Sequence, residues 1–233
     1  MSTADYQVPP PSYDSISPPT YLPDSTNSAV LNIPVKGIPP GLECLTQVNQ
    51  LLVQEKFVTS QGLGRAFNIL NGSGQQIFQA CEQVRCCRPM QDLAIQDLSG
   101  RNVMGLTQYC KCSCTEQMME VNASPGNCIG YIGWMWNTFA THMLVKNINQ
   151  EVVLHVLGPG MQTSIFGNVS FEIKSRDEQH VVGMIRNENE TFIVSFPLDL
   201  DVTIKALLLA TCYYLNSAIH QKRRETTNRF SSD

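Results

Sequence analysis

The sequence lacks the features that mark several large functional classes. Its 233 residues carry a formal net charge of -4, so no excess of positive charge is present to bind nucleic acid. It has no Gly-x-Ser-x-Gly motif and no glycine-rich loop that would hold a phosphate. The four histidines are dispersed along the chain, at His142, His155, His180 and His220. We therefore expect no nucleic-acid partner and no enzyme that makes or breaks covalent bonds.

A secretory signal is also missing from the N-terminus. Residues 1–24 are polar and proline-rich, with no basic segment followed by an apolar core. We therefore expect the folded body on the cytosolic side, where thiols stay reduced. The nine cysteines then indicate free thiols for lipid or metal rather than a disulfide framework.

Residues 1–36 hold few large apolar side chains, and this composition predicts a disordered, proline-rich arm. Two copies of a Pro-Pro-x-Tyr motif lie in it, formed by Pro10, Pro11 and Tyr13 and by Pro18, Pro19 and Tyr21. Such motifs bind the aromatic groove of WW domains as a polyproline II segment, and two copies gain avidity. WW- or SH3-domain proteins are the predicted partners, and an ordinary proline-rich linker is the alternative.

The middle of the chain, residues 37–201, has the pattern of a β-meander. Five pairs of β-type segments flank polar turns: 67–70 with 76–80, 93–97 with 102–106, 118–122 with 128–134, 143–147 with 151–156, and 169–174 with 179–185. Turn-forming Asn, Gly, Ser, Pro and Asp residues separate the partners. A meander of about ten to twelve strands can close on itself and remove its edges. The sequence therefore predicts a mainly β fold, a closed antiparallel barrel.

Residues 202–220 have a helical pattern that ends near Ile219, and residues 221–233 form a polar tail. The apolar core is short, about residues 206–215, and eighteen helical residues reach only about 27 Å against a hydrocarbon layer of about 30 Å. Three basic residues follow the helix, Lys222, Arg223 and Arg224, so the positive-inside rule places the C-terminal tail in the cytosol. A single span would then put the body on the opposite side, which conflicts with a cytosolic body. These arguments favour a helix buried in the barrel over a membrane span.

Several blocks of the sequence resemble the phospholipid scramblase family. Residues 39–45 read Pro-Pro-Gly-Leu-Glu-Cys-Leu, with Cys44 where the family has tyrosine, and residues 171–175, 181–183 and 196–202 read Phe-Glu-Ile-Lys-Ser, Val-Val-Gly and Phe-Pro-Leu-Asp-Leu-Asp-Val. The resemblance runs from about residue 37 to about residue 219. It implies a tubby-like barrel of roughly twelve strands around a hydrophobic helix. It also implies ATP-independent, bidirectional movement of phospholipids between leaflets at the cytosolic face of the plasma membrane.

The resemblance further implies a calcium-binding segment that ends at Asp199. Its six ligand positions are Glu188, Glu190, Phe192, Val194, Phe196 and Asp199. Ile193 occupies the position where a good loop has glycine, so the expected affinity is weak, about 10⁻⁴ M or poorer. The alternative is an acidic turn that leads into a strand at 192–196.

Five cysteines form two groups, Cys86 with Cys87, and Cys110, Cys112 and Cys114. Scramblases carry a fatty-acylated cysteine run near the second group, so the resemblance implies lipidation here. Two or more acyl chains give stable anchoring where one is marginal. Plain thiols and a zinc site are the alternatives, although no Cys-x-x-Cys spacing is present.

Two functions follow from these features. One is lipid scrambling. A single short helix offers no polar pathway for a lipid headgroup, so scrambling would need a homo-oligomer or local thinning of the bilayer. The other is an acylated adaptor at the membrane whose proline-rich arm recruits WW- or SH3-domain partners.

Overall fold

The computed structural model describes residues 37–56, 64–83, 92–108, 118–124, 126–135, 140–160, 168–189 and 191–230. A short 3-10 helix, η1 (Glu43–Gln47), precedes the first strand. The twelve strands are β1 (Gln50–Lys56), β2 (Ala66–Asn71), β3 (Gln76–Gln83), β4 (Asp92–Asp97), β5 (Asn102–Gln108), β6 (Met118–Ala123), β7 (Asn127–Trp134), β8 (Ala140–Lys146), β9 (Val152–Pro159), β10 (Val169–Ser175), β11 (Val181–Glu188) and β12 (Thr191–Ser195). The last element is the helix α2 (Val202–Phe230).

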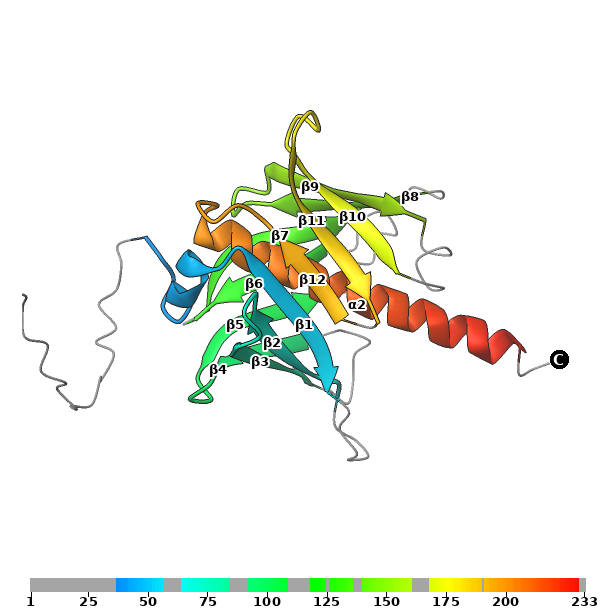
Figure 1. Cartoon of the computed structure of the whole chain (residues 1–233), viewed down its shortest axis with the longest axis horizontal. Coiled ribbons are helices and arrows are strands. Elements are labelled where there is room, and N and C mark those ends of the chain that lie inside the picture. The colour runs from blue at the N-terminus through cyan, green and yellow to red at the C-terminus, as the bar shows by residue number, and fades with distance from the viewer. Residues whose placement is uncertain are drawn as a thin grey trace, which may run out of the picture. The chain divides into compact units, whose positions relative to one another are not determined.

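The strands form one closed antiparallel barrel in which each strand pairs with its neighbours in sequence (Figure 1). The barrel closes where β1 pairs with β12, with Leu51 opposite Val194. Strands β2 to β11 correspond to the five predicted pairs. The predicted closed β-barrel is therefore confirmed.

Strand β1 was not among the predicted pairs. Nine residues separate β1 from its neighbour β2 in the sequence, more than a short hairpin turn contains. Its other partner, β12, lies about 140 residues further along the chain. A hairpin pattern cannot reveal such a long-range pair, because only barrel closure brings the two strands together.

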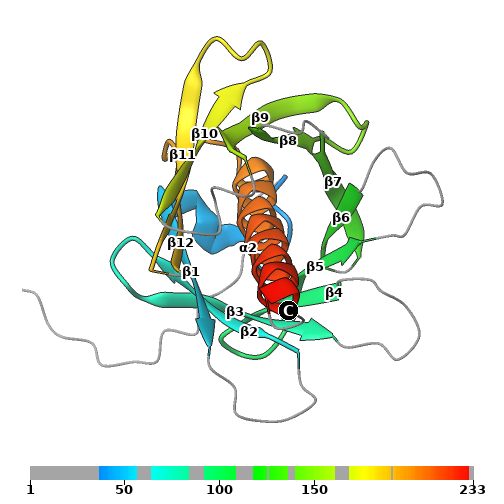
Figure 2. The same cartoon turned by 90° about the vertical axis from the view of Figure 1, so that its right-hand side faces the viewer.

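Strands alternate between the barrel interior and its surface, as half-buried strands do. In β10, for example, Val169, Phe171 and Ile173 are buried, whereas Ser170 and Glu172 are exposed. The inward side chains do not meet across the barrel, because α2 runs through it (Figure 2).

The buried helix confirms the predicted barrel-buried arrangement. Residues 206–215 are each at most 4% exposed. Gly130 on β7 allows a close approach, since a Cβ there would lie 2.4 Å from the Lys146 carbonyl oxygen and 2.9 Å from Leu207 Cδ1. Helix and strands therefore share one core.

The helix is longer than the sequence pattern indicates, because it continues to Phe230 rather than ending near Ile219. Residues 220–227 carry only polar side chains and so show no apolar periodicity, although Thr226 Oγ1 donates to the Lys222 carbonyl (3.0 Å) at helical spacing. Among the described residues, α2 alone has the length and composition of a membrane span, over Val202–Thr227. However, 83% of its most apolar window is buried inside the barrel.

Candidate functional site

The predicted Phe-Pro-Leu-Asp-Leu-Asp segment forms the turn between β12 and α2. The Phe196 amide donates to the Asn49 carbonyl (3.0 Å), which extends the pairing of β12 with the start of β1. Asp201 caps the helix, because its Oδ1 accepts from the amides of Thr203 (2.8 Å) and Ile204 (3.2 Å). This segment therefore positions the start of α2.

Lys205 lies in the first turn of α2 and is completely buried. Its ammonium donates to three backbone carbonyls, those of Leu45 (2.9 Å), Val48 (2.9 Å) and Leu198 (2.7 Å). All three ammonium donors thus have an acceptor. Burial lowers the pKa of Lys205, and the carboxylates of Asp199 and Asp201 oppose that shift. The lysine is an internal anchor that joins α2, η1 and the turn before the helix.

A second polar anchor holds α2 where it leaves the barrel. Arg65 Nη2 donates to Glu82 Oε1 (2.8 Å), and Arg65 Nη1 donates to Asn216 Oδ1 (2.7 Å). Arg65 also donates to the Ser217 hydroxyl, and the Tyr213 hydroxyl donates to Glu82 Oε1 (2.6 Å). One arginine and one carboxylate therefore join the strand ends to three residues of α2.

The charges in this second anchor are coupled. Burial alone would raise the pKa of Glu82, but hydrogen bonds from Arg65 and Tyr213 lower it below its ordinary value. Burial and the Glu82 carboxylate raise the pKa of Tyr213, so the phenol stays protonated and donates. The sequence pattern does not reveal this anchor, because its charged pair, Arg65 and Glu82, is separated by 17 residues and meets α2 only in the folded chain.

The described residues predicted to bind calcium do not form one coordination shell. Glu188 ends β11 and lies 3.3 Å from Arg186, whereas Asp199 lies in the turn before α2. Strand β12 separates them, and its five residues span about 13 Å. Phe192 and Val194 are buried, and their backbones pair with β1 and β11. Glu190 lies outside the described residues, and calcium binding stays a prediction.

The other predicted site residues also lie outside the described part of the chain. These are the lipidation candidates Cys86, Cys87, Cys110, Cys112 and Cys114, and the partner-binding residues Pro10, Pro11, Tyr13, Pro18, Pro19 and Tyr21. Two strand ends next to these cysteines in the sequence contact α2. Glu82 contacts Tyr213, and Gln108 Nε2 donates to the Tyr214 hydroxyl (3.2 Å). The ends of β3 and β5 therefore lie at the end of the barrel from which α2 emerges.

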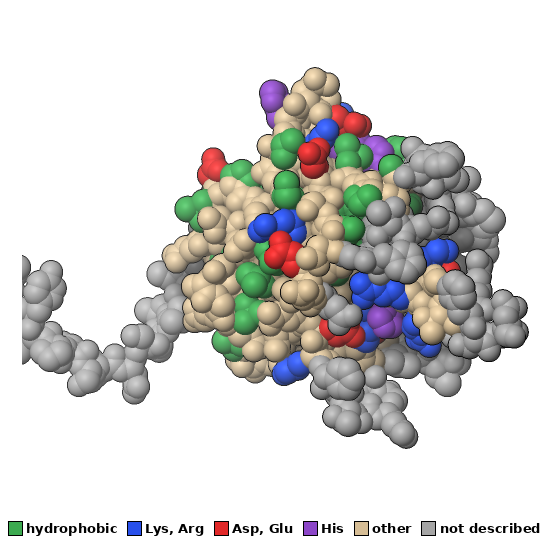
Figure 3. Space-filling model, turned by 45° about the vertical axis from the view of Figure 1, so that its right-hand side comes forward, with side chains coloured by type: hydrophobic (Ala, Val, Ile, Leu, Met, Phe, Trp, Pro, Cys, Tyr) green, Lys and Arg blue, Asp and Glu red, His purple; other side chains and the backbone are tan. Residues whose placement is uncertain are grey.

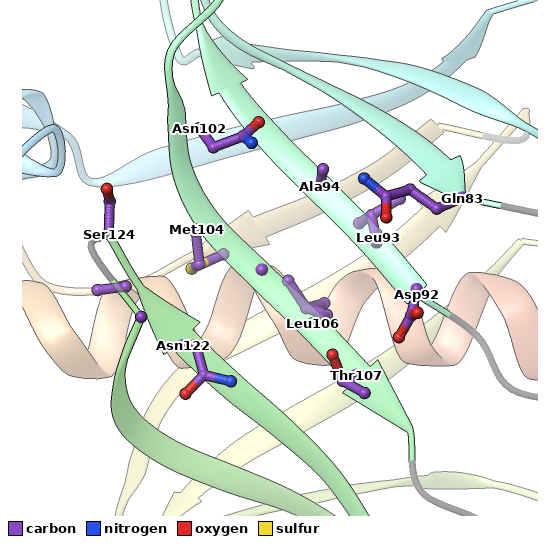
Figure 4. A pocket seen from close by; sticks show the side chains of 13 residues that line it. Gln83, Asp92, Leu93, Ala94, Asn102, Met104, Leu106, Thr107, Asn122 and Ser124 are labelled. Atoms are coloured by element: carbon purple, nitrogen blue, oxygen red, sulfur yellow. The ribbon is translucent and has the colours of Figure 1, made fainter.

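A pocket of about 290 Å³ lies on strands β3 to β6 (Figure 4). Leu93, Met104 and Leu106 contribute apolar surface, and Asn102 and Asn122 contribute amides. Among the described residues, Asp92 is the one ionisable residue in its lining. A single carboxylate does not supply the acid and base pair of a hydrolase, and we assign no reaction to this pocket.

Comparison with known proteins identifies one family over most of the chain. The model of the Scramblase family matches residues 28–221. Phospholipid scramblase 1 of Rattus norvegicus is 34% identical over 207 residues, which cover 76% of this chain and 62% of the rat protein. Phospholipid scramblase 1 of Homo sapiens is 34% identical, covering 78% and 66% of the two chains, and phospholipid scramblase 2 of Bos taurus is 31% identical, covering 82% and 75%.

The chain spans a little under two thirds of the length of the rat and mouse proteins that it matches, 62% and 64% respectively. No solved structure gives a significant match to it.

Proposed function

Since the chain belongs to the phospholipid scramblase family, we propose that it promotes ATP-independent, bidirectional movement of phospholipids between the two leaflets of a membrane. The observation that supports this most is the extent of the family match. Residues 28–221 include all twelve strands and the barrel-buried part of α2. The activity would involve no bond chemistry.

The buried helix limits how such movement can occur. Because α2 runs through the barrel (Figure 2), side chains of the helix and the strands form one packed core, so a polar headgroup has no path along the barrel axis. Withdrawing α2 would expose inward side chains such as Phe67, Phe171 and Phe192. Each exposed large apolar side chain costs about 1.5–3 kcal/mol, and a few of them equal a typical net stability of about 5–15 kcal/mol. We therefore propose that α2 stays in the barrel.

A barrel that keeps its helix would act on the bilayer from its surface. Local thinning of the bilayer, by one copy or by an oligomer, would lower the barrier that the hydrocarbon layer presents to a headgroup. The calcium prediction is separate from this mechanism, because the described residues in the predicted segment do not form a calcium shell in this fold.

We propose that the membrane contact lies at the end of the barrel from which α2 emerges. In the sequence, the two groups of predicted acylation sites follow β3 and β5, and these strands contact α2 at this end through Glu82 and Gln108. Lys222, Arg223 and Arg224 lie on the emerging part of α2, and Lys and Arg side chains gather on the right of Figure 3. Basic residues are attracted to the anionic cytosolic leaflet, so attachment to the cytosolic face of the plasma membrane is the proposed arrangement.

The test is dithionite quenching of fluorescent lipid in vesicles that carry the purified, acylated protein, with and without calcium. Scrambling brings inner-leaflet lipid to the dithionite, so the protected fraction falls. A fivefold cysteine-to-serine variant at positions 86, 87, 110, 112 and 114 should lose membrane attachment and flux together. An unchanged protected fraction with verified attachment of the wild-type protein rejects the scrambling proposal.

An acylated adaptor is the second candidate, and the two Pro-Pro-x-Tyr motifs in the arm favour it. An adaptor would bind tandem WW domains without moving lipid. Pull-down with tandem WW domains should fail for a Tyr13→Ala/Tyr21→Ala variant, whereas unchanged recovery would remove this candidate.

A further inference from the structure

Two histidines that are thirteen residues apart in the sequence lie side by side on the outside of the barrel. The β8–β9 register places His142 opposite Leu157 and His155 opposite Leu144, so the histidines are diagonal neighbours on one face. The alternating residues Met143 and Val156 point into the core. Nε2 of His142 lies 2.9 Å from Nδ1 of His155.

A carboxylate from the next hairpin completes the group. Glu178 lies in the β10–β11 turn, and its Oε1 lies 3.5 Å from Nδ1 of His155. The donor atoms of His142, His155 and Glu178 all lie within 4.8 Å of one another. Glu178 has a φ of 58°, whereas Gly74 and Gly100 hold the equivalent left-handed positions in two other hairpins. Gln150 (φ 62°) holds the same position in the β8–β9 hairpin, so this conformation is shared by glycine and non-glycine residues in the barrel.

The hydrogen bonds around His155 leave its inner nitrogen available as a ligand. His155 Nε2 lies 3.2 Å from the carbonyl oxygen of Arg176. A carbonyl can only accept, so Nε2 of neutral His155 carries the proton and its Nδ1 accepts from the Nε2–H of His142. An ion would replace that hydrogen bond, with the His142 proton moved to its own Nδ1. A backbone carbonyl on the outer nitrogen is the usual support for a metal-bound histidine.

The two donor separations at Nδ1 of His155 bracket the value for a small tetrahedral ion, and the third, between His142 and Glu178, is at most 4.8 Å, so Glu178 would move closer to His142 on binding. Ligands about 2.0–2.1 Å from a tetrahedral zinc lie about 3.3–3.4 Å from each other. The separations of 2.9 Å and 3.5 Å lie on either side of this value. The nearest strand neighbour with a positive charge is Lys174, which is paired with His155 in the sheet. Its ammonium is directed to Glu172 (3.4 Å), where a carboxylate offsets its charge. The geometry and the donor types agree.

We propose that His142, His155 and Glu178 form a binding site for a divalent transition metal ion of the zinc class. Two imidazole nitrogens and one carboxylate are typical zinc ligands, whereas calcium prefers oxygen ligands. The Glu178 side chain is 45% exposed, which leaves a fourth position open to water. The ion would join β8, β9 and the β10–β11 turn, and it is independent of the predicted calcium segment.

Zn²⁺ titration of the purified full chain, followed by calorimetry, tests this proposal. We expect one Zn²⁺ per chain through this site and a rise in the melting temperature. Mutation of a residue that supports a metal ligand typically lowers metal affinity about 10- to 100-fold. His142→Ala and His155→Ala remove ligands themselves, so each should lower the affinity by at least this factor. Glu178→Gln should lower it less. His180→Ala is the matched control, since His180 is an exposed histidine in the β10–β11 turn, two residues after Glu178.

Co²⁺ absorption separates this site from binding by the cysteines. Visible bands of four-coordinate cobalt without thiolate charge transfer support the histidine site, and these bands should disappear in His142→Ala. If His155→Ala fails to fold by circular dichroism, His142→Ala decides alone, because His142 is only half-buried. No binding by the wild-type chain, binding that survives His142→Ala, or a thiolate spectrum overturns the proposal.

Discussion

The ammonium of Lys205 lies 2.9 Å from the carbonyl oxygen of Leu45, a residue 160 positions earlier in the chain. This contact joins the first turn of α2 to η1, immediately before the barrel begins. In the sequence, Lys205 interrupts an apolar segment. In the fold it is a buried anchor whose three hydrogen bonds place the helix along the barrel.

Lys205→Met should destabilise the protein strongly. The substitution keeps most of the side-chain volume but removes the ammonium donor from the buried carbonyls of Leu45 and Val48 and from the partly buried carbonyl of Leu198, and a buried group left without its donor costs about 1–3 kcal/mol. We expect a loss of about 3–5 kcal/mol in the free energy of unfolding, and a melting temperature lower by about 6–20 °C. Chemical and thermal denaturation measure both quantities.

Lys222→Met is the control on the same helix, since Lys222 makes a partly exposed ion pair with Glu225 (3.3 Å). It should change stability by no more than about 0.5 kcal/mol. Equal stability losses for the two variants would show that the buried hydrogen bonds do not anchor the helix.

The anchor of Arg65 and Glu82 should make stability depend on acid pH. Because the pKa of Glu82 is lowered in the folded protein from its ordinary value of 4.5, its contribution is complete above about pH 4.5 and is lost as the pH falls through the folded pKa. Glu82→Gln should therefore flatten the fall in melting temperature between about pH 5 and about pH 3. His142, whose pKa burial lowers, affects both proteins equally. Burial also lowers the pKa of His220 and the Glu82 carboxylate opposes that shift, so the two proteins are compared below about pH 5.

Hydrogen exchange gives a second readout of this anchor. Arg65→Lys cannot reach all the acceptors on Glu82, Asn216 and Ser217. Amides of α2 near Asn216 should exchange faster in this variant, while those near Lys205 stay protected. Uniform acceleration along the helix would contradict a local anchor.

Calcium binding should be weak if it occurs through the predicted residues. Isothermal titration should detect no affinity tighter than about 10⁻⁴ M, and Glu188→Gln/Asp199→Asn should abolish any saturable binding. Tight binding that this double variant removes would mean that the segment rearranges from the strand seen here. Binding unaffected by the variant would place calcium elsewhere.

Acylation should depend on the two predicted cysteine groups. Acyl-biotin exchange should label the wild-type protein from cells and fail to label the serine variant at positions 86, 87, 110, 112 and 114. Serine at Cys44, Cys81 and Cys128 is the control and should leave labelling intact. Cys212 is completely buried inside the barrel and should not be acylated. Labelling that persists without the five cysteines would reject the proposed anchor.

Local sequence patterns predicted most of the barrel because hairpins carry their own signals. Turns such as Asn71 to Gly74 and Asp97 to Gly100 lie between alternating strands, so β2 to β5 could be found from neighbouring residues. Strand β1 has no such signal, because β12 pairs with it from the far end of the chain. The end of α2 was also missed, since its last turns carry no apolar periodicity.

The sequence by itself determined the β-barrel class, the family and the apolar character of the last helix, because these depend on local periodicity and on motifs of neighbouring residues. Only the tertiary structure decided that Lys205 is a buried anchor, that Arg65 and Glu82 hold the emerging helix, and that His142 and His155 are neighbours. The physical reason is that these contacts depend on strand register and barrel closure, which no local pattern encodes.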